Sequence, residues 1–412
     1  MNFLFSVPKP EEVLAEVKIL LKDAKYSQAD SLLRKAEKKN IYHDDLILAH
    51  SNVHALMGNC AEQQNEIKRF IAQKEGNVLH HLKAVEYLIT EEHWDLAQKL
   101  LDQTKVRFPL SGFTHSTQAQ IDCHQGGFEE AAAALLKKQE LKKLDDSDIK
   151  LVHQIRKGAK NITSLTSDSA ITTLLATEQV RQILIRYYFE RFESLGGDCE
   201  FGFHQRRHGR EPLSLFRWGG MPRDSMIKLF QNKFKDFATK ESSKLKSNVP
   251  TFEEDVGGGS MEYYFHDTNY EYMAHTSIGK KSKDFMETED EVYERLQPHF
   301  LMLARKLHED LEDSEKGFVF KSKPGLSHEE CFEFHDALCS IGNTKLIIVL
   351  LKQSEKPDYE ILRPNLVIAR VTRWWGGGAS SPKDMLPHRE WDNLIEISYN
   401  HFLQHYPEMD VA

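Results

Sequence analysis

An internal repeat of 34 residues in the first third of the chain constrains its fold more than any other feature. Three columns of matching positions recur at this spacing: Tyr26, Cys60, Trp94 and Phe128; Ala29, Gln63, Ala97 and Ala131; and Leu33, Ile67, Leu101 and Leu135. Residues four apart lie on one face of a helix, and a small residue on that face lets a second helix pack closely. The period therefore predicts helix–turn–helix units stacked along the chain.

This pattern resembles tetratricopeptide repeats over about residues 10–143, with Gly58 and Gly126 where that family favours turn residues. The second copy departs from the family, because Cys60 and Gln63 replace its aromatic residue and its Ala. The resemblance implies a solenoid that binds a protein or peptide partner. A short structural cap on the following domain is the alternative.

The charge and the cysteine content argue against several classes of protein. With 54 Lys and Arg against 63 Asp and Glu, the formal net charge is −9, which argues against binding to nucleic acid. No apolar run reaches the roughly 18–20 residues of a membrane helix, and the first residues lack the basic start of a signal peptide. The five cysteines form no C-x-x-C pair. We therefore expect a cytoplasmic protein with free thiols and no membrane insertion.

The rest of the chain is predicted to form one α/β domain. Continuous apolar strands, such as residues 345–351 and 365–371, alternate with amphipathic helices. This alternation predicts a three-layer α/β domain with a mostly parallel sheet over residues 170–412. The polar segment 144–169 is expected to be a partly helical linker after the helical repeat domain, residues 1–143.

The segment SLGGDCEFG (194–202) is the strongest candidate for chemistry. It predicts a strand end, a Gly-Gly turn and a helix that starts near Cys199, and open α/β folds bind ligands at such a crevice. A helix N-terminus favours a thiolate and binds an oxyanion through its backbone N–H groups. We therefore expect an oxyanion site at Gly197, Asp198, Cys199 and Glu200. The alternative is a structural Cys with Asp198 as the helix cap.

FESLGGDCEFG and the later SLFRW resemble blocks in a family of uncharacterised bacterial proteins, some of which carry N-terminal tetratricopeptide repeats. More distantly, they are similar to bacterial proteins labelled papain-like cysteine peptidases. That family has a Cys after SLG-x-x and a His further along, and Cys199 and His275 match these two positions. Arg217 and Thr276 stand where the family has acidic residues. The resemblance implies a Cys–His site.

A thiol nucleophile needs a base within hydrogen-bond reach, and His275 is the candidate for this role. His275 follows the alternating residues of an expected strand, so its ring can project from the strand end. His266, beside Asp267, is a rival, although neighbouring strand residues point to opposite faces. A packed His without a catalytic role is the alternative.

The sequence leaves the third, orienting residue open. Gly197-Asp198-Cys199 is similar to the Gly-Asp-Ser start of a lipase and esterase family, with Cys in place of Ser. That family ends in an Asp-x-x-His pair, whereas Asp384 and His388 of this chain are one residue further apart. This resemblance makes Asp384 the candidate for the orienting carboxylate.

The remaining candidates concern substrate and cofactors. Arg206 is expected either to hold an acidic group of the substrate or to lie on a solvated basic face, and Arg217 and Trp218 are further candidates for substrate contact. Neither a phosphate-binding G-x-x-x-x-G-K-[ST] nor a G-x-G-x-x-G after a strand occurs. The N-terminal histidines show no obvious ligand spacing, so we expect neither a cofactor nor a metal.

Two functions from different classes follow. The first is a cysteine-dependent hydrolase or acyl-transfer enzyme, with Cys199 as nucleophile and His275 as base, joined to partner-binding repeats. The second is a non-catalytic protein whose repeats recruit a partner while the α/β domain binds a small molecule or a glycan. By analogy alone, the second function is linked to bacterial polysaccharide metabolism.

Overall fold

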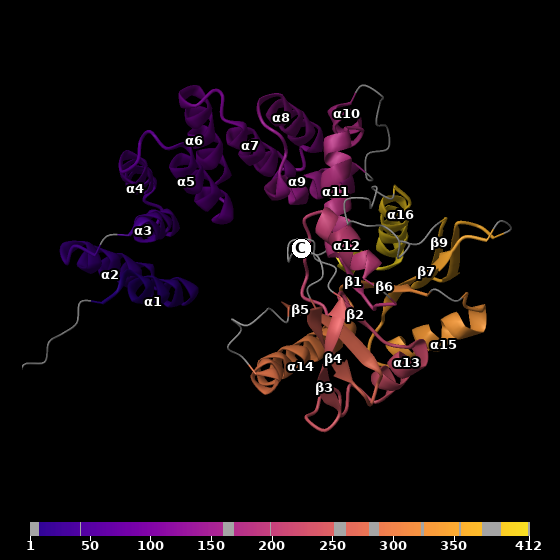
Figure 1. Cartoon of the computed structure of the whole chain (residues 1–412). Helices are drawn as coiled ribbons and strands as arrows, with labels where there is room; N and C mark the ends of the chain where they lie inside the picture. The colour runs from indigo at the N-terminus through magenta and orange to yellow at the C-terminus, as the bar shows by residue number, and fades with distance from the viewer. Residues whose placement is uncertain are drawn as a thin grey trace, which may run out of the picture. The chain divides into compact units, whose positions relative to one another are not determined.

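The computed structural model describes residues 8–41, 43–159, 169–197, 199–250, 261–279, 288–322, 325–353, 356–372 and 389–410. The chain divides into two compact units, residues 1–183 and 184–412. The first unit is helical, and the second contains two sheets with helices around them (Figure 1). The fold is therefore a helical repeat followed by an α/β domain, as the sequence predicts.

Consecutive helices build the first unit. They are α1 (Pro10–Lys22), α2 (Tyr26–Lys38), α3 (Asp44–Leu56), α4 (Cys60–Ala72), α5 (Val78–Thr90), α6 (Trp94–Arg107), α7 (Gly112–His124), α8 (Phe128–Leu141), η1 (Asp146–Asp148), α9 (Ile149–Ala159) and α10 (Ala170–Leu175), followed by α11 (Glu178–Glu190). The second helix of every repeat begins at the same column of the 34-residue pattern, since α2, α4, α6 and α8 start at Tyr26, Cys60, Trp94 and Phe128. The period thus marks real structural units.

The small and aliphatic columns of the repeat form its core. Ala29, Ala97 and Ala131 have no exposed surface, and the Leu four residues after each is buried as well. In the second repeat, which departs from the pattern, the same face of the helix points into the core, because Gln63 is buried. Its amide nitrogen has no hydrogen-bond partner in the described part of the chain, a cost that an Ala would avoid.

Helices continue past residue 143 into the segment expected to be a linker. Helix α9 packs against α7 and α8. Asp148 before it is fully buried and accepts a hydrogen bond of 2.6 Å from Lys138 Nζ. The part of the expected linker up to Ala159 therefore belongs to the first unit, while residues 160–168 lie outside the described residues.

The main sheet of the second unit has the strand order β1-β6-β7-β9-β8. Its strands are β1 (Phe192–Ser194), β6 (Gly317–Lys321), β7 (Lys345–Leu351), β8 (Tyr359–Arg363) and β9 (Leu366–Val371). The first four strands in this order are parallel, and β8 is antiparallel to β9. The mostly parallel sheet is therefore confirmed, with one antiparallel edge strand.

Helices cover both faces of this sheet. They are α12 (Glu200–Arg207), α13 (Arg223–Gln231), α14 (Glu289–Asp313), α15 (His328–Cys339) and α16 (Arg389–His405), with η4 (Pro407–Asp410) after them. Alternate strand residues such as Phe318 and Ile348 share a core with Phe334 of α15. On the opposite face, Phe192 of β1 contacts Phe402 of α16.

A second, antiparallel sheet contains the two strands, joined by a turn at Asp267–Asn269, that the sequence predicts over residues 261–278, together with two strands that it does not predict. Its order is β2-β5-β4-β3, with β2 (Gly219–Gly220), β3 (Ser243–Pro250), β4 (Met261–Asp267) and β5 (Tyr272–Gly279). Phe265 and Tyr272 pack into the same core as the main-sheet residue Phe318. Both sheets therefore belong to one folded body, and the second one carries His275.

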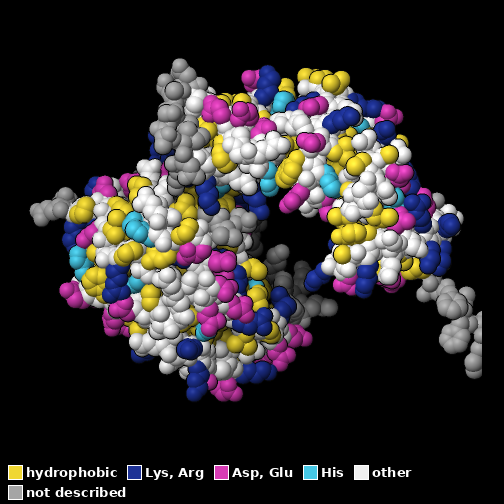
Figure 2. Space-filling model, turned by 180° about the vertical axis from the view of Figure 1, so that it is seen from behind, with side chains coloured by type: hydrophobic (Ala, Val, Ile, Leu, Met, Phe, Trp, Pro, Cys, Tyr) yellow, Lys and Arg dark blue, Asp and Glu magenta, His cyan; other side chains and the backbone are white. Residues whose placement is uncertain are grey.

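The surface mixes charges of both signs. Acidic and basic side chains are interspersed over each unit on the face seen in Figure 2, rather than separated into large areas of one sign. Among the described helices, none combines the length and the apolar content needed to cross a lipid bilayer.

Candidate functional site

Cys199 lies where the main sheet turns into α12. Strand β1 ends at Ser194, and the chain continues along β6, where the Leu195 N–H donates to the Val319 carbonyl at 2.8 Å. Cys199 is the residue directly before the first turn of α12, and it is half-buried. The strand, turn and helix that the sequence predicts around Cys199 are therefore formed.

Glycine is required at the turn before Cys199. Gly197 has a φ of +89°, and a Cβ at this position would lie 1.9 Å from the carbonyl oxygen of Lys321. At Gly196, with a φ of +82°, a Cβ would lie 3.0 Å from the carbonyl oxygen of Gly219. The turn is thus held between β6 and β2, and this close contact fixes where α12 starts.

The short strand β2 also brings His275 toward this turn. Gly219 and Gly220 pair with Ala274 and Met273 of β5. The backbone N–H of His275 donates to the Trp218 carbonyl at 2.9 Å. The turn that leads to Cys199 and the strand that carries His275 therefore contact the same short segment.

Two residues of β4 hold the His275 ring. Tyr264 lies directly opposite His275 in the strand register, and its hydroxyl is 2.6 Å from His275 Nε2. Glu262 Oε1 forms a hydrogen bond with His275 Nδ1. Glu262 is buried and also accepts a bond of 3.0 Å from the Ser277 N–H. Groups at both nitrogens therefore fix the orientation of the ring.

Electrostatics connect Cys199 with these residues. Burial raises the pKa of Tyr264, and negative charge on Glu262 and on Cys199 raises it further. Burial also holds the pKa of Tyr272 well above its usual range, with Cys199 adding to the effect. Such interactions weaken with distance, so both phenols sense the charge of Cys199 across the α/β unit. Tyr264 is thus linked to both Cys199 and His275.

Three of the other cysteines lack the features of a reactive thiol. Burial raises the pKa of Cys123 to about 12 and that of Cys331 to about 11, and it also raises the pKa of Cys339. A buried thiol with a raised pKa is a poor nucleophile at neutral pH. Cys60 is exposed, so it provides an internal reference for a thiol that is merely accessible.

A cavity of about 290 Å³ lies beside the His275 ring. His275, Arg217 and Trp218 are among the residues in its wall, together with apolar residues of α14 such as Leu303. Cys199 is not among the described residues of this wall. The structure therefore brings His275, Arg217 and Trp218 together at one cavity, and the turn before Cys199 contacts Gly219, the residue that follows Trp218.

Arg217 is a buried cation at this cavity. Its guanidinium donates to the carbonyls of Arg210 at 3.2 Å and Pro212 at 3.5 Å, and it lies 3.3 Å from a Glu211 carboxylate oxygen. Its Nε is buried without a hydrogen-bond partner in the described part of the chain. Burial lowers the pKa of Arg217 to about 10, so the side chain remains charged at neutral pH.

Arg206 and Trp218 extend the same group. The guanidinium carbons of Arg206 and Arg217 lie 4.6 and 4.8 Å from a ring centroid of Trp218. Arg206 also pairs with Glu211 at 3.0 Å and is exposed. Both arginines thus share one carboxylate and one aromatic ring, as cation–π packing allows.

The Glu200 side chain has a structural role. It is buried, forms an ion pair with the buried Lys321 of β6, and accepts a hydrogen bond of 2.9 Å from Trp391 Nε1 of α16. These contacts tie α12 to the sheet and to the last helix. The expected oxyanion role of Glu200 therefore concerns its backbone N–H and not its carboxylate.

Two sequence candidates, Asp198 and Asp384, lie outside the described residues. The rival His266 does not use Asp267 as a partner, because that carboxylate accepts bonds from Ala238 N–H and Ser242 Oγ instead. The sequence analysis missed Glu262 and Tyr264. Glu262 and Tyr264 are two residues apart on one strand, so their side chains lie on the same face, and this strand pairs with the strand that carries His275. This spacing is the signal that could have revealed them.

No family model matches the chain, and a search of the curated proteins finds no match either.

Proposed function

We propose that the α/β unit is a cysteine-dependent hydrolase or acyl-transfer enzyme, with Cys199 as nucleophile and His275 as general base. The observation that carries this proposal is the His275 ring, which Glu262 holds at Nδ1 beside a cavity and next to the Cys199 turn. A carboxylate at Nδ1 orients an imidazole and stabilises its protonated form. Glu262 takes the orienting role for which the sequence suggested Asp384.

The chemistry would proceed through an acyl-enzyme. His275 accepts the thiol proton, and the Cys199 thiolate attacks the carbonyl carbon of an ester, thioester or amide. Backbone N–H groups at the start of α12, around Cys199 and Glu200, bind the tetrahedral oxyanion. Its collapse expels the leaving group, which takes the proton from His275, and leaves a thioester on Cys199. Water or a second nucleophile then releases the acyl group and restores the thiol.

We assign Tyr264 the relay of the first proton. Its hydroxyl contacts His275 Nε2, and its pKa responds to charge on Cys199. A hydroxyl can donate one proton while it accepts another, so it can pass a proton from the thiol to the imidazole.

The substrate of this site would carry an acidic group. The buried Arg217 at the cavity wall has an unpaired Nε, and a carboxylate is the natural ligand of a guanidinium. The resemblance to papain-like peptidases has an acidic residue at this position, so Arg217 reverses the expected charge. We therefore favour an acyl substrate with a carboxylate over a peptide with a basic side chain.

In a second proposal, the cavity binds a ligand and the α/β unit has no catalytic activity. The aromatic face of Trp218 beside Arg217 suits a sugar ring that carries an acidic group, so the unit could bind a glycan. The first unit would then recruit a protein or peptide, as tetratricopeptide-like repeats do. The large apolar side chains of Val106 and Leu110, which are more than four-fifths exposed, support such a contact.

We also infer that the protein works in a reducing compartment such as the cytoplasm. All five cysteines are free thiols. A catalytic thiol must stay reduced, and cytoplasmic conditions maintain this state.

Acyl trapping separates the two functions. The purified chain is incubated with carboxylate-bearing thioesters and esters, and the adducts are located by mass spectrometry. The enzyme proposal expects an acyl group on Cys199 that is absent in Cys199→Ala and retained in Cys60→Ser. His275→Gln should slow its formation by about 100-fold. Saturable binding that is equal in the native chain and in Cys199→Ala, with no adduct, would favour the glycan-binding role.

A further inference from the structure

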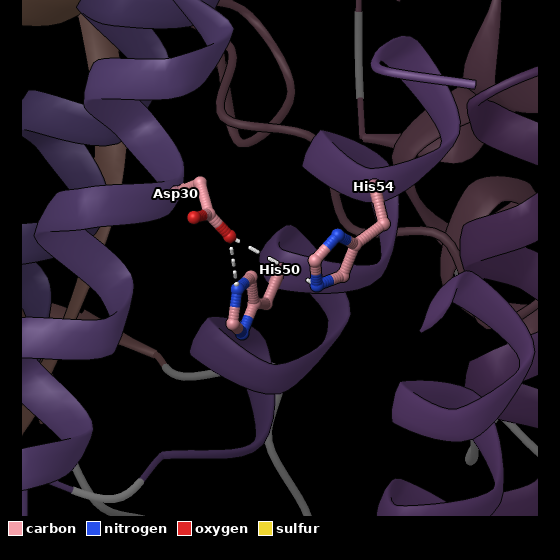
Figure 3. A group of neighbouring side chains, drawn as sticks. All are labelled: Asp30, His50 and His54. Carbon is pink, nitrogen blue, oxygen red and sulfur yellow. Dashed lines mark hydrogen bonds and ion pairs between the residues drawn. The ribbon is translucent and has the colours of Figure 1, made fainter. Parts of the chain in front are cut away.

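Three side chains that can bind a metal ion meet between two helices of the first unit. Asp30 extends from α2, and His50 and His54 extend from α3 toward its carboxylate (Figure 3). One ligand atom of each residue lies within 4.8 Å of the others. The two histidines are four residues apart, so they lie on the same face of α3, with ring centroids 4.5 Å apart.

The distances in this group suit a metal ion after small side-chain movements. Asp30 Oδ1 is 2.9 Å from His50 Nε2 and 4.0 Å from His54 Nε2. Ligand atoms of a tetrahedral zinc site are about 3.3 Å apart, given metal–ligand bonds of about 2.0–2.1 Å. The measured values lie on both sides of that separation. The three ligand atoms, all within 4.8 Å of one another, therefore lie close to the spacing of such a site.

His54 has an unmet need for a partner. The side chain is 3% exposed, and its Nδ1 has no hydrogen-bond partner in the described part of the chain. Its Nε2 points toward Asp30 but lies beyond hydrogen-bond distance from it. A metal ion beside Asp30 would bind this Nε2, whereas Nδ1 lies on the other side of the ring.

Neighbouring charges support the same arrangement. Arg34 Nε donates to the other oxygen of Asp30 at 2.9 Å, which leaves Oδ1 directed at the histidines. Glu66 of α4 lies 3.8 Å from His50 Nδ1, on the far side of the ring. A carboxylate behind a histidine ligand is a recurrent feature of zinc sites, since it fixes the tautomer and raises the basicity of the ring.

From this geometry we propose that Asp30, His50 and His54 form a binding site for one divalent transition-metal ion, with zinc as the best fit. Two imidazoles and one carboxylate favour such ions over calcium or magnesium, which prefer oxygen ligands alone. Three protein ligands leave a fourth position for water. The ion replaces the proton between His50 and Asp30, and this proton is released to solvent. The proposal does not depend on the function of the α/β unit, and it replaces the sequence expectation of no metal.

Zinc titration of the full chain tests the site. Isothermal titration calorimetry on chelator-treated protein should show one zinc ion per chain. The variants His50→Gln and His54→Gln should each weaken binding by roughly 100-fold or more, and Glu66→Gln by about 10-fold. His124→Gln, which changes an exposed histidine of α7 outside the group, is the matched control and should leave the affinity unchanged. Equal affinity in all variants would overturn the proposal.

Two further measurements keep the test decisive if a variant unfolds. Cobalt(II) bound to the native chain should lack the thiolate charge-transfer band, because no Cys takes part. With histidine-labelled native protein, the ring nitrogens of two histidines should shift on addition of zinc. In a folded His50→Gln variant, the signals of one of the two are absent and those of the other, His54, should no longer shift at the same zinc concentration. Cobalt–thiolate absorption, or shifts at other histidines, would place the ion elsewhere and refute the site.

Discussion

The two units each hold a buried carboxylate–histidine group, and the two groups differ in how they are completed. In the α/β unit, both nitrogens of His275 are occupied, by Glu262 and by Tyr264. In the helical unit, Nδ1 of His54 has no partner in the described part of the chain, and its Nε2 faces Asp30 without a hydrogen bond. A ring fixed by protein groups suits proton transfer, whereas a ring that lacks partners suits a ligand from outside.

The two groups also differ in how the chain assembles them. Asp30, His50 and His54 come from two helices that follow each other in the repeat, so the contact is local. The His275 group depends on the pairing of β4 with β5 and of β5 with β2, and its connection to Cys199 depends on the main sheet. Damage to the α/β core should therefore abolish Cys199 reactivity without changing zinc binding.

The largest effect is expected from Lys321→Met. This substitution leaves the Glu200 carboxylate buried without its cation, and breaking a buried pair costs about 3–5 kcal/mol. Urea unfolding of the α/β unit, followed by near-UV circular dichroism, measures the loss. The double variant Glu200→Gln/Lys321→Met should recover part of it. Zinc affinity should stay at the native value. A parallel loss of zinc binding would show that the zinc site of the helical unit depends on the α/β core, contrary to the comparison above.

Gly197→Ala should destabilise the α/β unit by about 3 kcal/mol or more. The new Cβ would meet the Lys321 carbonyl at a residue with positive φ. Gly58→Ala in the helical unit is the matched control, because its φ is +75° and no atom lies within 4 Å of its Cβ position. This control isolates the backbone strain, about 1–2 kcal/mol. Equal losses in chemical denaturation would show that the turn is not packed as described.

Glu193→Gln should change the pH dependence of stability. Burial raises the pKa of Glu193 to about 7, with a hydrogen bond to Asp310 adding to the shift and Lys306 opposing it. Because the folded state keeps a proton that the unfolded state loses, native stability falls as pH rises from about 4.5 to about 7. In Glu193→Gln this decline should shrink by about 1–2 kcal/mol. Denaturation at a series of pH values measures it, and an unchanged slope would contradict the assignment.

The smallest effect is expected from Arg206→Ala. Arg206 is exposed, and an exposed ion pair such as Arg206–Glu211 contributes less than about 1 kcal/mol. Stability should therefore remain within this margin of the native value. Binding of a carboxylate-bearing ligand should weaken much more in Arg217→Ala than in Arg206→Ala, because only Arg217 is buried at the cavity. Equal weakening would show that the cavity is not the binding site.

The sequence predicted those features that depend on local periodicity. The 34-residue columns predicted both the starts of α2, α4, α6 and α8 and the buried Ala positions. The Gly-Gly-Asp-Cys segment predicted the turn between β1 and α12. These features follow from backbone preferences and from spacing within one or two elements.

The partners of each histidine were not predictable in the same way. Glu262 and Tyr264 meet His275 through strand register, and the register contains an irregularity between Glu262 and Tyr264 that no spacing rule supplies. Within the second sheet, the pair β4–β5 was predicted, whereas β3 and β2, which has only two residues, were not. Likewise, the four-residue spacing of His50 and His54 was not recognised as a ligand pattern, and Asp30 joins them only through the packing of α2 on α3.

Site-resolved alkylation tests the central claim about Cys199 most directly. Iodoacetamide is added at neutral pH to the native chain and to His275→Ala and Glu262→Gln, and modification of all five cysteines is followed by mass spectrometry. The account predicts that half-buried Cys199 reacts ahead of exposed Cys60, and that its rate falls by about tenfold or more in both variants while the Cys60 rate stays constant. A Cys199 that reacts no faster than Cys60, or whose rate ignores the loss of His275, would contradict the account.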